Sequence, residues 1–571
     1  MRVAILGAGV AGLSAAHELV ERGVDVDLYD RLAIAGGKAR SVVVQREHQE
    51  GFPGEHGFRY FASFYRHVID TMERTPLHGG GRVVDNLCDA PEGMFAQAGI
   101  PPLGMPTIGP TSIDDIIERF KAIEKYVEAV SIDDIEAFAE KMWQVMTSCR
   151  ARRFAEYENM SWNSFLDAEN RSEAFNTWFA DAATHTLIAA SGDRASSRTV
   201  GDITAQLLLG GWTPGVPSDR LLNGPTNEAW IDPWLAYLRS TGRFTLHTDC
   251  IIREVHFETG GELSVSDVVI EANGERSTVT ADAYISAMPV EVLSTLVPAD
   301  VAAKSPTLST AASLAKHVQT MAGIQIYLRN DAPIVQGHTV YVASDWGLTS
   351  VSQQQFWNLD LREVSEGAIG GVLSVDISNW TTSGTNGKRA LDCEPDEICD
   401  EVLTQIRACL GDDAAVDLGP DNIHSHFIDP DIVFFANGGV AANHEPLLVN
   451  ELGSWWIRPN AYTEVSNLYL AGDFVKTNTD LATMVGANEA ARRAVNAIIR
   501  DHRLKAPLCK IWDVHEPEIL APLRWIDARR YARGKPWSSS FTRPMRWLAH
   551  VVTWWRRHAS SAHQHTAEPP S

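Results

Sequence analysis

The chain has 571 residues, a mass of 62.7 kDa and a net charge of −24 at neutral pH. Apolar residues make up 44% and charged residues 21% of the sequence, as in ordinary globular proteins, which excludes a disordered, collagen-like or coiled-coil chain. The length predicts several domains, and the strong acidity argues against nucleic-acid binding.

The N-terminal stretch carries the clearest motif. Residues 3–6 predict a buried strand, Gly7-x-Gly9-x-x-Gly12 follows, and a helical run then leads to a second strand that ends at Asp30. In a dinucleotide site the first glycine allows a tight turn, the second lets the backbone approach a pyrophosphate, and the third lets the helix pack on the strand. We therefore expect a dinucleotide on the helix N-terminus and Asp30 on its ribose, with Asp27 as the competing acid.

A second glycine pair follows soon after this unit. Gly36 and Gly37 precede Lys38 and Arg40. This pattern indicates a cofactor that extends beyond its pyrophosphate, with the chain turning back over it and the two cations contacting a diphosphate. The alternative is a basic surface loop.

The third motif lies near the C-terminus. Asn467-Leu-Tyr-Leu-Ala-Gly-Asp473 predicts a buried strand and its turn, and a helix is expected to start near Thr483 within Leu481-Ala-Thr-Met-Val-Gly-Ala. Together with the first two motifs, the sequence resembles the FAD-dependent amine oxidase and phytoene desaturase superfamily. The resemblance is greatest to phytoene desaturase-like and hydroxysqualene dehydroxylase-like bacterial flavoproteins.

Two positions depart from the family pattern. Val485 stands where relatives usually have glutamate, so any chemical role of that glutamate is absent here. Asp30 stands where FAD enzymes usually have glutamate, which leaves a nicotinamide cofactor as an open alternative.

The resemblance implies non-covalent FAD, because no distinctive Cys or His attachment motif is present. The residues expected to contact FAD are Gly7, Gly9, Ala11, Gly12, Asp30, Arg31, Gly37, Lys38, Arg40, Ile252, Gly472, Asp473, Thr483 and Met484. Four residues are candidates for the active site. His56 and Arg59 lie in a segment similar to the desaturases' Gly-Leu-His-x-Phe-Phe, and Trp455 and Trp456 lie where amine oxidases form an aromatic cage.

The expected fold is α/β, with a Rossmann-type FAD-binding domain of the glutathione reductase and amine oxidase type. We expect this domain to consist of residues 1–90, 240–300 and 445–500. The resemblance places an inserted α+β substrate domain at 91–239 and 301–444, with a helical cap within 112–190 and a sheet floor that includes 319–328 and 432–441.

Cysteine usage and the N-terminus indicate the compartment. The seven cysteines are odd in number and none forms a C-x-x-C pair, so we expect neither disulfides nor a metal site. Met1 and Arg2 lead into an apolar strand with no signal-peptide pattern, and no run of 18 apolar residues is present. These features predict a cytoplasmic protein.

The C-terminal segment is basic, although the rest of the chain is acidic. Residues 501–571 hold twelve Lys or Arg and six Asp or Glu. Residues 519–533 and 543–558 show amphipathic helical patterns, so 501–558 is expected to be a helical tail and 559–571 to be disordered. A basic, Trp-rich amphipathic helix is typical of contact with a membrane surface, so the protein could be peripheral at the cytoplasmic membrane. The alternative is a helix packed on the protein body.

The resemblance implies hydride transfer between flavin and an allylic carbon of a long apolar isoprenoid, in a carotenoid- or squalene-like desaturation or dehydroxylation. A quinone or oxygen would be the electron acceptor. Two alternatives stay open: a flavin amine oxidase that acts on an amine or amino acid, and a non-catalytic prenyl-binding escort protein of the same fold.

Overall fold

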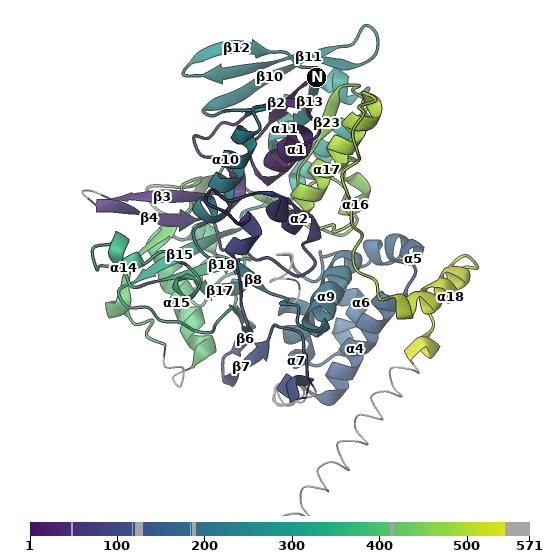
Figure 1. Ribbon diagram of the computed structural model, residues 1–571. Helices are drawn as coiled ribbons and strands as arrows, with labels where there is room; N and C mark the ends of the chain where they lie inside the picture. The colour runs from purple at the N-terminus through teal and green to yellow at the C-terminus, as the bar shows by residue number, and fades with distance from the viewer. Residues whose placement is uncertain are drawn as a thin grey trace, which may run out of the picture.

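A parallel five-stranded sheet forms the centre of the upper unit in Figure 1. Its order is β23-β13-β1-β2-β9, so strands from both ends and the middle of the chain meet in one sheet. The computed structural model describes all residues except 47–48, 113, 117, 120–129, 183, 185–189, 412–415 and 543–571. The strands are β1 (Arg2–Leu6), β2 (Asp25–Tyr29), β9 (Phe244–His247), β13 (Ala283–Ser286) and β23 (Leu468–Leu470).

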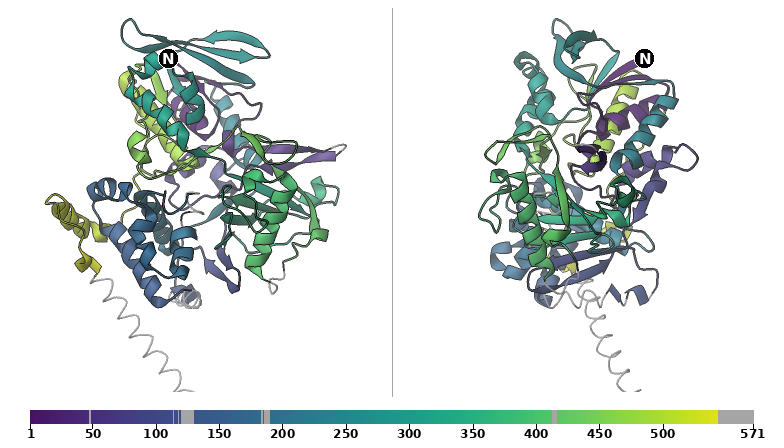
Figure 2. Two further views of the ribbon diagram at one scale, coloured as in Figure 1. Left: turned by 180° about the vertical axis from the view of Figure 1, so that it is seen from behind. Right: turned by 90° about the vertical axis from the view of Figure 1, so that its left-hand side faces the viewer.

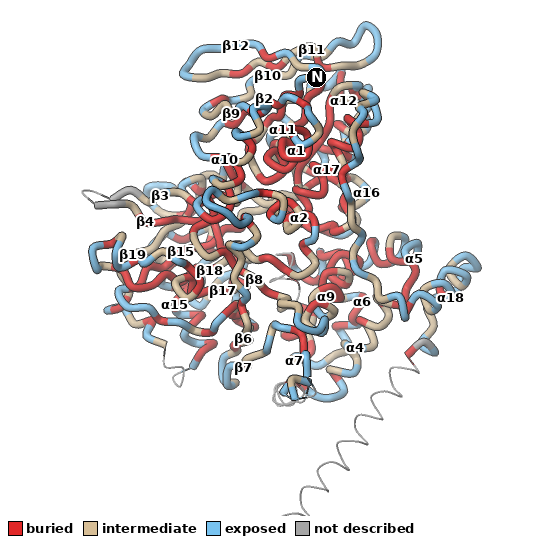
Figure 3. Tube along the Cα trace, in the orientation of Figure 1, coloured by how far each residue is buried: buried red, intermediate tan, exposed pale blue. Residues whose placement is uncertain are grey.

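Two long helices cover this sheet. α1 (Val10–Val20) is buried along its whole length and packs against α17 (Met484–Asp501). α10 (Asp232–Ser240) also packs on α1, although the sequence predicted it at the end of the substrate domain. An antiparallel sheet of β10 (Cys250–Glu258), β11 (Ser264–Ala272) and β12 (Glu275–Val279) lies at the top of Figure 3, with exposed residues on β10 and β12 and buried or intermediate ones on β11.

A seven-stranded sheet forms the second unit, in the order β19-β15-β18-β17-β16-β6-β7. β15 is buried at every residue, including Gln325, whose side-chain amide donates to the Ser374 hydroxyl at 3.0 Å. α15 (Pro395–Leu410) contributes to the same apolar core. The strands are β6 (Glu92–Gln97), β7 (Ile100–Pro106), β15 (Ala322–Leu328), β16 (His338–Tyr341), β17 (Leu348–Ser352), β18 (Gly371–Ile377) and β19 (Ile423–Ile428).

A group of helices stands beside this sheet, below the five-stranded unit (Figure 2). Its main members are α4 (Ile132–Thr147), α5 (Arg150–Ala155), α6 (Trp162–Leu166) and α9 (Ser197–Trp212), which enclose an apolar core around Trp162 and Phe165. The α/β fold, with a Rossmann-type unit and a mixed substrate unit, is confirmed.

Shorter elements complete the described fold. The helices are α2 (Arg66–Arg74), α7 (Glu173–Phe175), α11 (Val290–Leu296), α12 (Ala299–Ala302), α13 (Pro306–Leu314), α14 (Leu361–Val364), α16 (Ser454–Ile457) and α18 (Ala521–Tyr531). The strands pair as β3 (Ser41–Arg46) with β4 (Gln49–Glu55), β5 (Leu87–Asp89) with β8 (Arg220–Leu222), β14 (Val318–Gln319) with β22 (Leu447–Leu448), and β20 (Ile432–Phe434) with β21 (Val440–Asn443).

The C-terminal tail is described only in part. α18 packs on α4 and α5 through Asp527, whose carboxylate accepts a hydrogen bond from Arg152 Nε at 3.0 Å. The predicted amphipathic helix at 543–558 and the segment 559–571 lie outside the described residues. Within the described part of the chain, every helix is too short or too polar to cross a bilayer. All seven cysteines belong to that part, and all are free thiols.

A buried ion network ties the helical group to the five-stranded unit. The carboxylate of Asp480, in the loop before α17, pairs with Arg458 Nη1 at 2.5 Å and with Arg198 on α9. Arg198 also pairs with Glu158 at 2.9 Å. All four side chains are buried. Since a buried charge is stable only when it is paired, the network fixes this loop against the substrate unit.

We predict that Asp480→Asn lowers the free energy of unfolding by about 3 kcal/mol, because it leaves Arg458 buried without its charge partner. Denaturant unfolding of the purified protein measures this loss. Asp25→Asn is the matched control, because it breaks an exposed pair with Arg243 and should change stability little. Equal stability of the two variants would contradict a structural role for the network.

Candidate functional site

A groove of about 470 Å³ runs along the carboxyl ends of the parallel strands, where open α/β sheets bind ligands. It brings together residues that lie hundreds of positions apart in the sequence. Of the residues predicted to contact the cofactor, those that line the groove are Gly7, Gly9, Ala11, Asp30, Arg31, Gly37, Lys38, Ile252, Gly472, Asp473, Thr483 and Met484.

Two helix N-termini face this groove. α1 starts after Gly9 and α17 after Thr483, and in the described structure neither terminus is capped by a side chain. Free N–H groups and the helix dipole favour negative charge at both places. The arrangement therefore fits a cofactor with a diphosphate at one point and an electron-rich ring at another, as in FAD.

The glycines of the first motif differ in their roles. A Cβ on Gly9 would meet no protein atom closer than 3.8 Å, so the space beside it belongs to the groove. A Cβ on Gly12 would lie 1.9 Å from the carbonyl oxygen of Gly7, so Gly12 permits the close packing of α1 on β1 and does not line the groove. Gly7 has φ +112°, a conformation that favours glycine.

Asp30 is held at the end of β2. Its Oδ2 accepts from the backbone N–H of Ala8 at 2.5 Å and its Oδ1 from that of Leu32 at 2.8 Å. Burial raises the pKa of Asp30. The competing acid, Asp27, pairs with Arg2 and His247 and does not line the groove. Asp30 is therefore the better placed of the two acids for a ribose contact.

The predicted cations are bound mainly to protein carboxylates. Arg40 is buried outside the groove and pairs with Glu445 at 2.8 Å and with Asp431 at 2.5 Å. Arg31 pairs with Glu445 at 3.0 Å. Lys38 donates to the carbonyl oxygen of Pro446 and lies 3.5 Å from Glu291. The position of Arg40 thus does not support the prediction that it contacts a diphosphate. Its charge is neutralised by Asp431 and Glu445, which lie far from it in the sequence but next to it in the fold.

One group among the described residues has metal-ligand geometry. His56, Asp429 and Glu445 place possible ligand atoms within 4.8 Å of one another. The Arg40 guanidinium lies 2.8 Å from Glu445 and 3.7 Å from Asp429. Because the Arg40 guanidinium already supplies the positive charge next to these two carboxylates, we interpret the three residues and Arg40 as an ion-pair network.

A second cavity, of about 250 Å³, adjoins the groove. His56, Arg59 and Asp376 line both. His56 Nδ1 lies 3.2 Å from Asp429 Oδ2, and its Nε2 lies 3.1 Å from the carbonyl oxygen of Met321. Although burial opposes it, the hydrogen bond and charge of His56 lower the pKa of Asp429 to about 2. We refer to this space as the inner cavity.

Arg59 closes one side of the inner cavity. Its guanidinium donates to the carbonyl oxygens of Lys38, Ala39 and Phe58 at 3.0, 3.2 and 3.3 Å. The side chain therefore joins the second glycine loop to the wall between the two cavities. His56 and Arg59, both predicted from the sequence, meet at this wall.

Sequence reasoning missed Asp376, which lies on β18. Burial raises its pKa to about 6, although Arg59, His56 and His338 oppose the shift. No motif contains this residue. The available signal was a lone acid in the apolar strand Gly371–Ile377, where an unpaired charge is costly.

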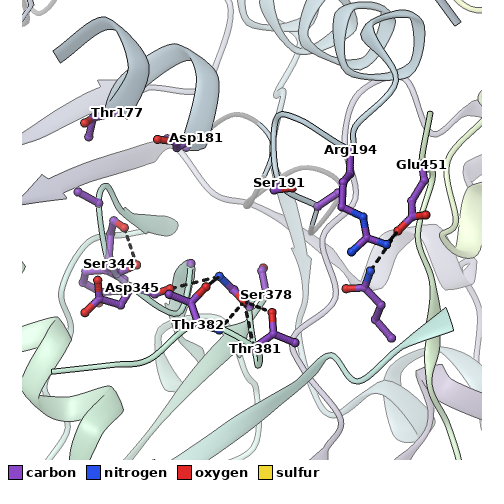
Figure 4. Close-up of a pocket in the computed structure, with 17 residues that line it drawn as sticks. Thr177, Asp181, Ser191, Arg194, Ser344, Asp345, Ser378, Thr381, Thr382 and Glu451 are labelled. Carbon is purple, nitrogen blue, oxygen red and sulfur yellow. Dashed lines mark hydrogen bonds and ion pairs between the residues drawn. The ribbon is translucent and has the colours of Figure 1, made fainter. Parts of the chain in front are cut away.

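A third cavity, of about 390 Å³, lies between the helical group and the seven-stranded sheet and meets the inner cavity at Ser378. Figure 4 shows hydroxyl and carboxylate groups gathered around it, with Arg194 directed towards Glu451. Of the residues that the structure describes, three acids line this outer cavity, namely Asp181, Asp345 and Glu451.

The tryptophan pair lies elsewhere. Trp455 packs against Phe154, and the guanidinium of Arg198 lies over the Trp455 ring, 4.6 Å from the centroid of that ring. Trp456 is 51% exposed. Among the described residues, neither lines the groove or the inner cavity. Their predicted role as an aromatic cage finds no support in this position, because α16 directs both rings towards α5 and the surface.

We predict that Gly9→Val abolishes flavin retention and leaves the fold intact, because the added side chain enters the groove and not the protein core. Flavin absorbance per protein after gel filtration measures retention, and circular dichroism checks the fold. Gly261→Val, in open space between β10 and β11, is the control. A Gly9→Val protein with a full complement of flavin would show that the groove does not hold the cofactor.

Comparison with known proteins supports the interpretation of the groove as an FAD site. A zeta-carotene desaturase of Capsicum annuum is 26% identical over 315 residues, 52% of this chain and 50% of that protein. A hydroxyneurosporene desaturase of Rubrivivax gelatinosus is 38% identical over 96 residues, 17% of this chain and 16% of that one. The longer match thus spans about half of the desaturase it matches.

Solved structures show the same fold. An oxidoreductase from Methanosarcina mazei has a TM-score of 0.56 and 14% identity, covering 88% of this chain and 100% of that one. A putrescine oxidase bound to putrescine has a TM-score of 0.55 and 14% identity, covering 88% and 99%. A family model described as flavin-containing amine oxidoreductase matches residues 10–499. The chain therefore belongs to the flavin-containing amine oxidoreductase family and is an FAD-dependent oxidoreductase.

Proposed function

We propose that this protein transfers hydride between FAD and an allylic carbon of a long apolar isoprenoid, as a desaturase or a reductive dehydroxylase. The similarity to carotenoid desaturases supports this class. Bound FAD supplies a two-electron centre that exchanges hydride with carbon. The observation that carries the proposal is the apolar wall of the inner cavity, formed beside the groove by Met321, Leu447, Leu448 and Leu481.

The inner cavity has two unlike sides. Its apolar wall suits a hydrocarbon segment, and its polar side carries His56, Arg59 and Asp376. A volume of about 250 Å³ holds the reacting segment of a long isoprenoid and not the whole molecule. In desaturation, a hydride leaves one carbon, a proton leaves its neighbour, and a double bond remains. The electrons then pass to a quinone or to oxygen.

A second function has support from the outer cavity. Among the described residues that line it, Asp181, Asp345 and Glu451 outnumber the one cation, Arg194, so it suits a cationic end group. This observation favours an amine substrate, for which hydride would leave a carbon next to nitrogen. The apolar wall of the inner cavity favours the isoprenoid.

We expect the FAD-loaded protein to lose its visible flavin absorbance under anaerobic conditions when mixed with ζ-carotene in phosphatidylcholine vesicles. Putrescine should leave the spectrum unchanged. Empty vesicles are the control. Bleaching by putrescine alone would replace the isoprenoid proposal with the amine oxidase.

We also propose that the C-terminal tail contacts a membrane surface, from which an isoprenoid would reach the protein. On the described part of the tail, Ile519 is 85% exposed, Trp525 55% and Ile526 40%. The guanidinium of Arg529 lies 3.5 Å from the ring centroid of Trp525. Exposed apolar and cationic groups together suit an anionic lipid surface.

Deletion of 543–571 should therefore reduce co-sedimentation with anionic vesicles and leave flavin content unchanged, because the deleted segment contains the second basic amphipathic pattern. Deletion of 559–571 alone is the matched control and should keep vesicle binding. If both truncated proteins bind vesicles as well as the full chain does, the tail is not the membrane contact.

A further inference from the structure

We propose that Asp376 is the proton acceptor of the desaturation, and the proton donor when the reaction runs as a reductive dehydroxylation. The inference rests on the proposed function. In desaturation, with FAD held in the groove as the hydride acceptor, the C–H bond on the neighbouring carbon would break and its electron pair would form the new double bond. The proton from that bond goes to the carboxylate of Asp376 and then exchanges with solvent. In dehydroxylation, the Asp376 carboxyl would protonate the leaving hydroxyl, which would depart as water, and the carbon would receive the hydride that FAD in its reduced form would supply.

The position of Asp376 is the first argument. Among the described residues that line the inner cavity, it is the one carboxylate, and it also lines the groove. It therefore stands between the space assigned to the substrate and the space assigned to the cofactor. A group that accepts or donates the proton coupled to a hydride transfer has to lie within reach of the substrate on the side next to the cofactor.

The surroundings of the carboxylate are the second argument. Its Oδ1 is buried and has no hydrogen-bond partner among the described residues. The atom lies in a niche against Gly57 and Gly323, where added Cβ atoms would come within 2.3 and 2.8 Å of it. An oxygen without a donor is tolerated better in the neutral acid than in the carboxylate, so the site favours uptake of a proton.

Three other polar side chains that line the inner cavity, His56, Arg59 and Asn450, already have hydrogen-bond partners. Both ring nitrogens of His56 face acceptors, Asp429 and the Met321 carbonyl oxygen. Arg59 has no acceptor atom and donates to three backbone carbonyl groups. Asn450 is bonded to Arg458 and to the backbone of Asp480. These three side chains are therefore engaged with other groups, and Asp376 is the carboxyl group of the cavity that is left to exchange a proton.

The charged groups around Asp376 set its titration range. Burial raises the pKa of Asp376 to about 6, while the charges of Arg59, His56 and His338 and a hydrogen bond from the Phe58 backbone N–H lower it. His338 is itself bonded to Asp219 at 2.5 Å. The carboxyl group is therefore mostly ionised above about pH 6 and ready to accept a proton, and it is protonated below that pH. The rate of desaturation should consequently fall as the pH falls through about 6.

The first test uses the FAD-loaded protein without substrate. Infrared difference spectroscopy between about pH 5 and about pH 8 should show a protonated carboxyl group that titrates near pH 6. The signal should vanish in Asp376→Asn and persist in Asp331→Asn. Asp331 is the matched control, because burial also raises its pKa and none of the three cavities includes it. Persistence of the signal in Asp376→Asn would overturn the proposal.

The second test measures anaerobic flavin reduction by ζ-carotene in phosphatidylcholine vesicles after rapid mixing. Asp376→Asn should be slower by about 10²–10⁴-fold and should lose the fall in rate near pH 6, whereas Asp331→Asn should behave as the original protein does. An unchanged rate and pH profile in Asp376→Asn would overturn the role of Asp376 alone. No reduction of the original protein would overturn the proposed function and, with it, this inference.

Gly57→Ala keeps the proposal testable if Asp376→Asn fails to fold. The added methyl group meets the Asp376 side chain first, at 2.3, 3.1 and 3.4 Å, so it displaces the carboxyl group without removing it. We expect a lower rate of flavin reduction, with the infrared signal still present. An undiminished rate with a shifted carboxyl signal would contradict the proposal.

Discussion

The buried carboxylate of Asp480 holds the helical group of the substrate unit against the five-stranded Rossmann-type unit. This carboxylate is shared by Arg458, just before β23, and Arg198, on the helical group. Arg458 also donates to the carbonyl oxygen of Asp473 at 2.9 Å, so the same ion network fixes both ends of the loop between β23 and α17. Because that loop ends at Thr483, the buried network sets where the uncapped N-terminus of α17 points.

The groove relies on backbone groups more than on side-chain cations. Arg31 and Arg40 are paired with Glu445, and Lys38 with a carbonyl group and Glu291. The N-termini of α1 and α17 offer N–H groups that have no competing side-chain partner in the described structure. An acidic chain can therefore hold a negatively charged dinucleotide, since the local field at helix N-termini is positive whatever the net charge.

The sequence predicted what short-range spacing determines. The strand, glycine motif, helix and Asp30 follow from one continuous segment, so the Rossmann-type unit and a dinucleotide cofactor could be inferred correctly. FAD itself followed from the family resemblance of the three motifs. Long-range pairing was not predictable: Glu445 neutralises Arg40 from 405 positions away. Trp455 and Trp456 were assigned from their proximity in sequence to the flavin motif, yet the turn of α16 takes them away from it. Asp376 belongs to no motif, and only the assembled sheet brings it to the cofactor groove.

The two units divide the chemistry between them. Val485, where the family resemblance expects glutamate, is fully buried against Ala62 and Tyr65. At that position α17 therefore carries an enclosed apolar side chain and no acid. The acid arrives instead from β18 of the substrate sheet. In the proposed reaction, the distance between Asp376 and the cofactor would then depend on how the two units are held together. The buried ion network bears on this geometry from the cofactor side, because Asp480 holds the loop whose next residues, Leu481 to Thr483, line the inner cavity together with Asp376. In the proposed reaction, hydride and proton would leave neighbouring carbons in this cavity, so a shift of that loop would change their alignment.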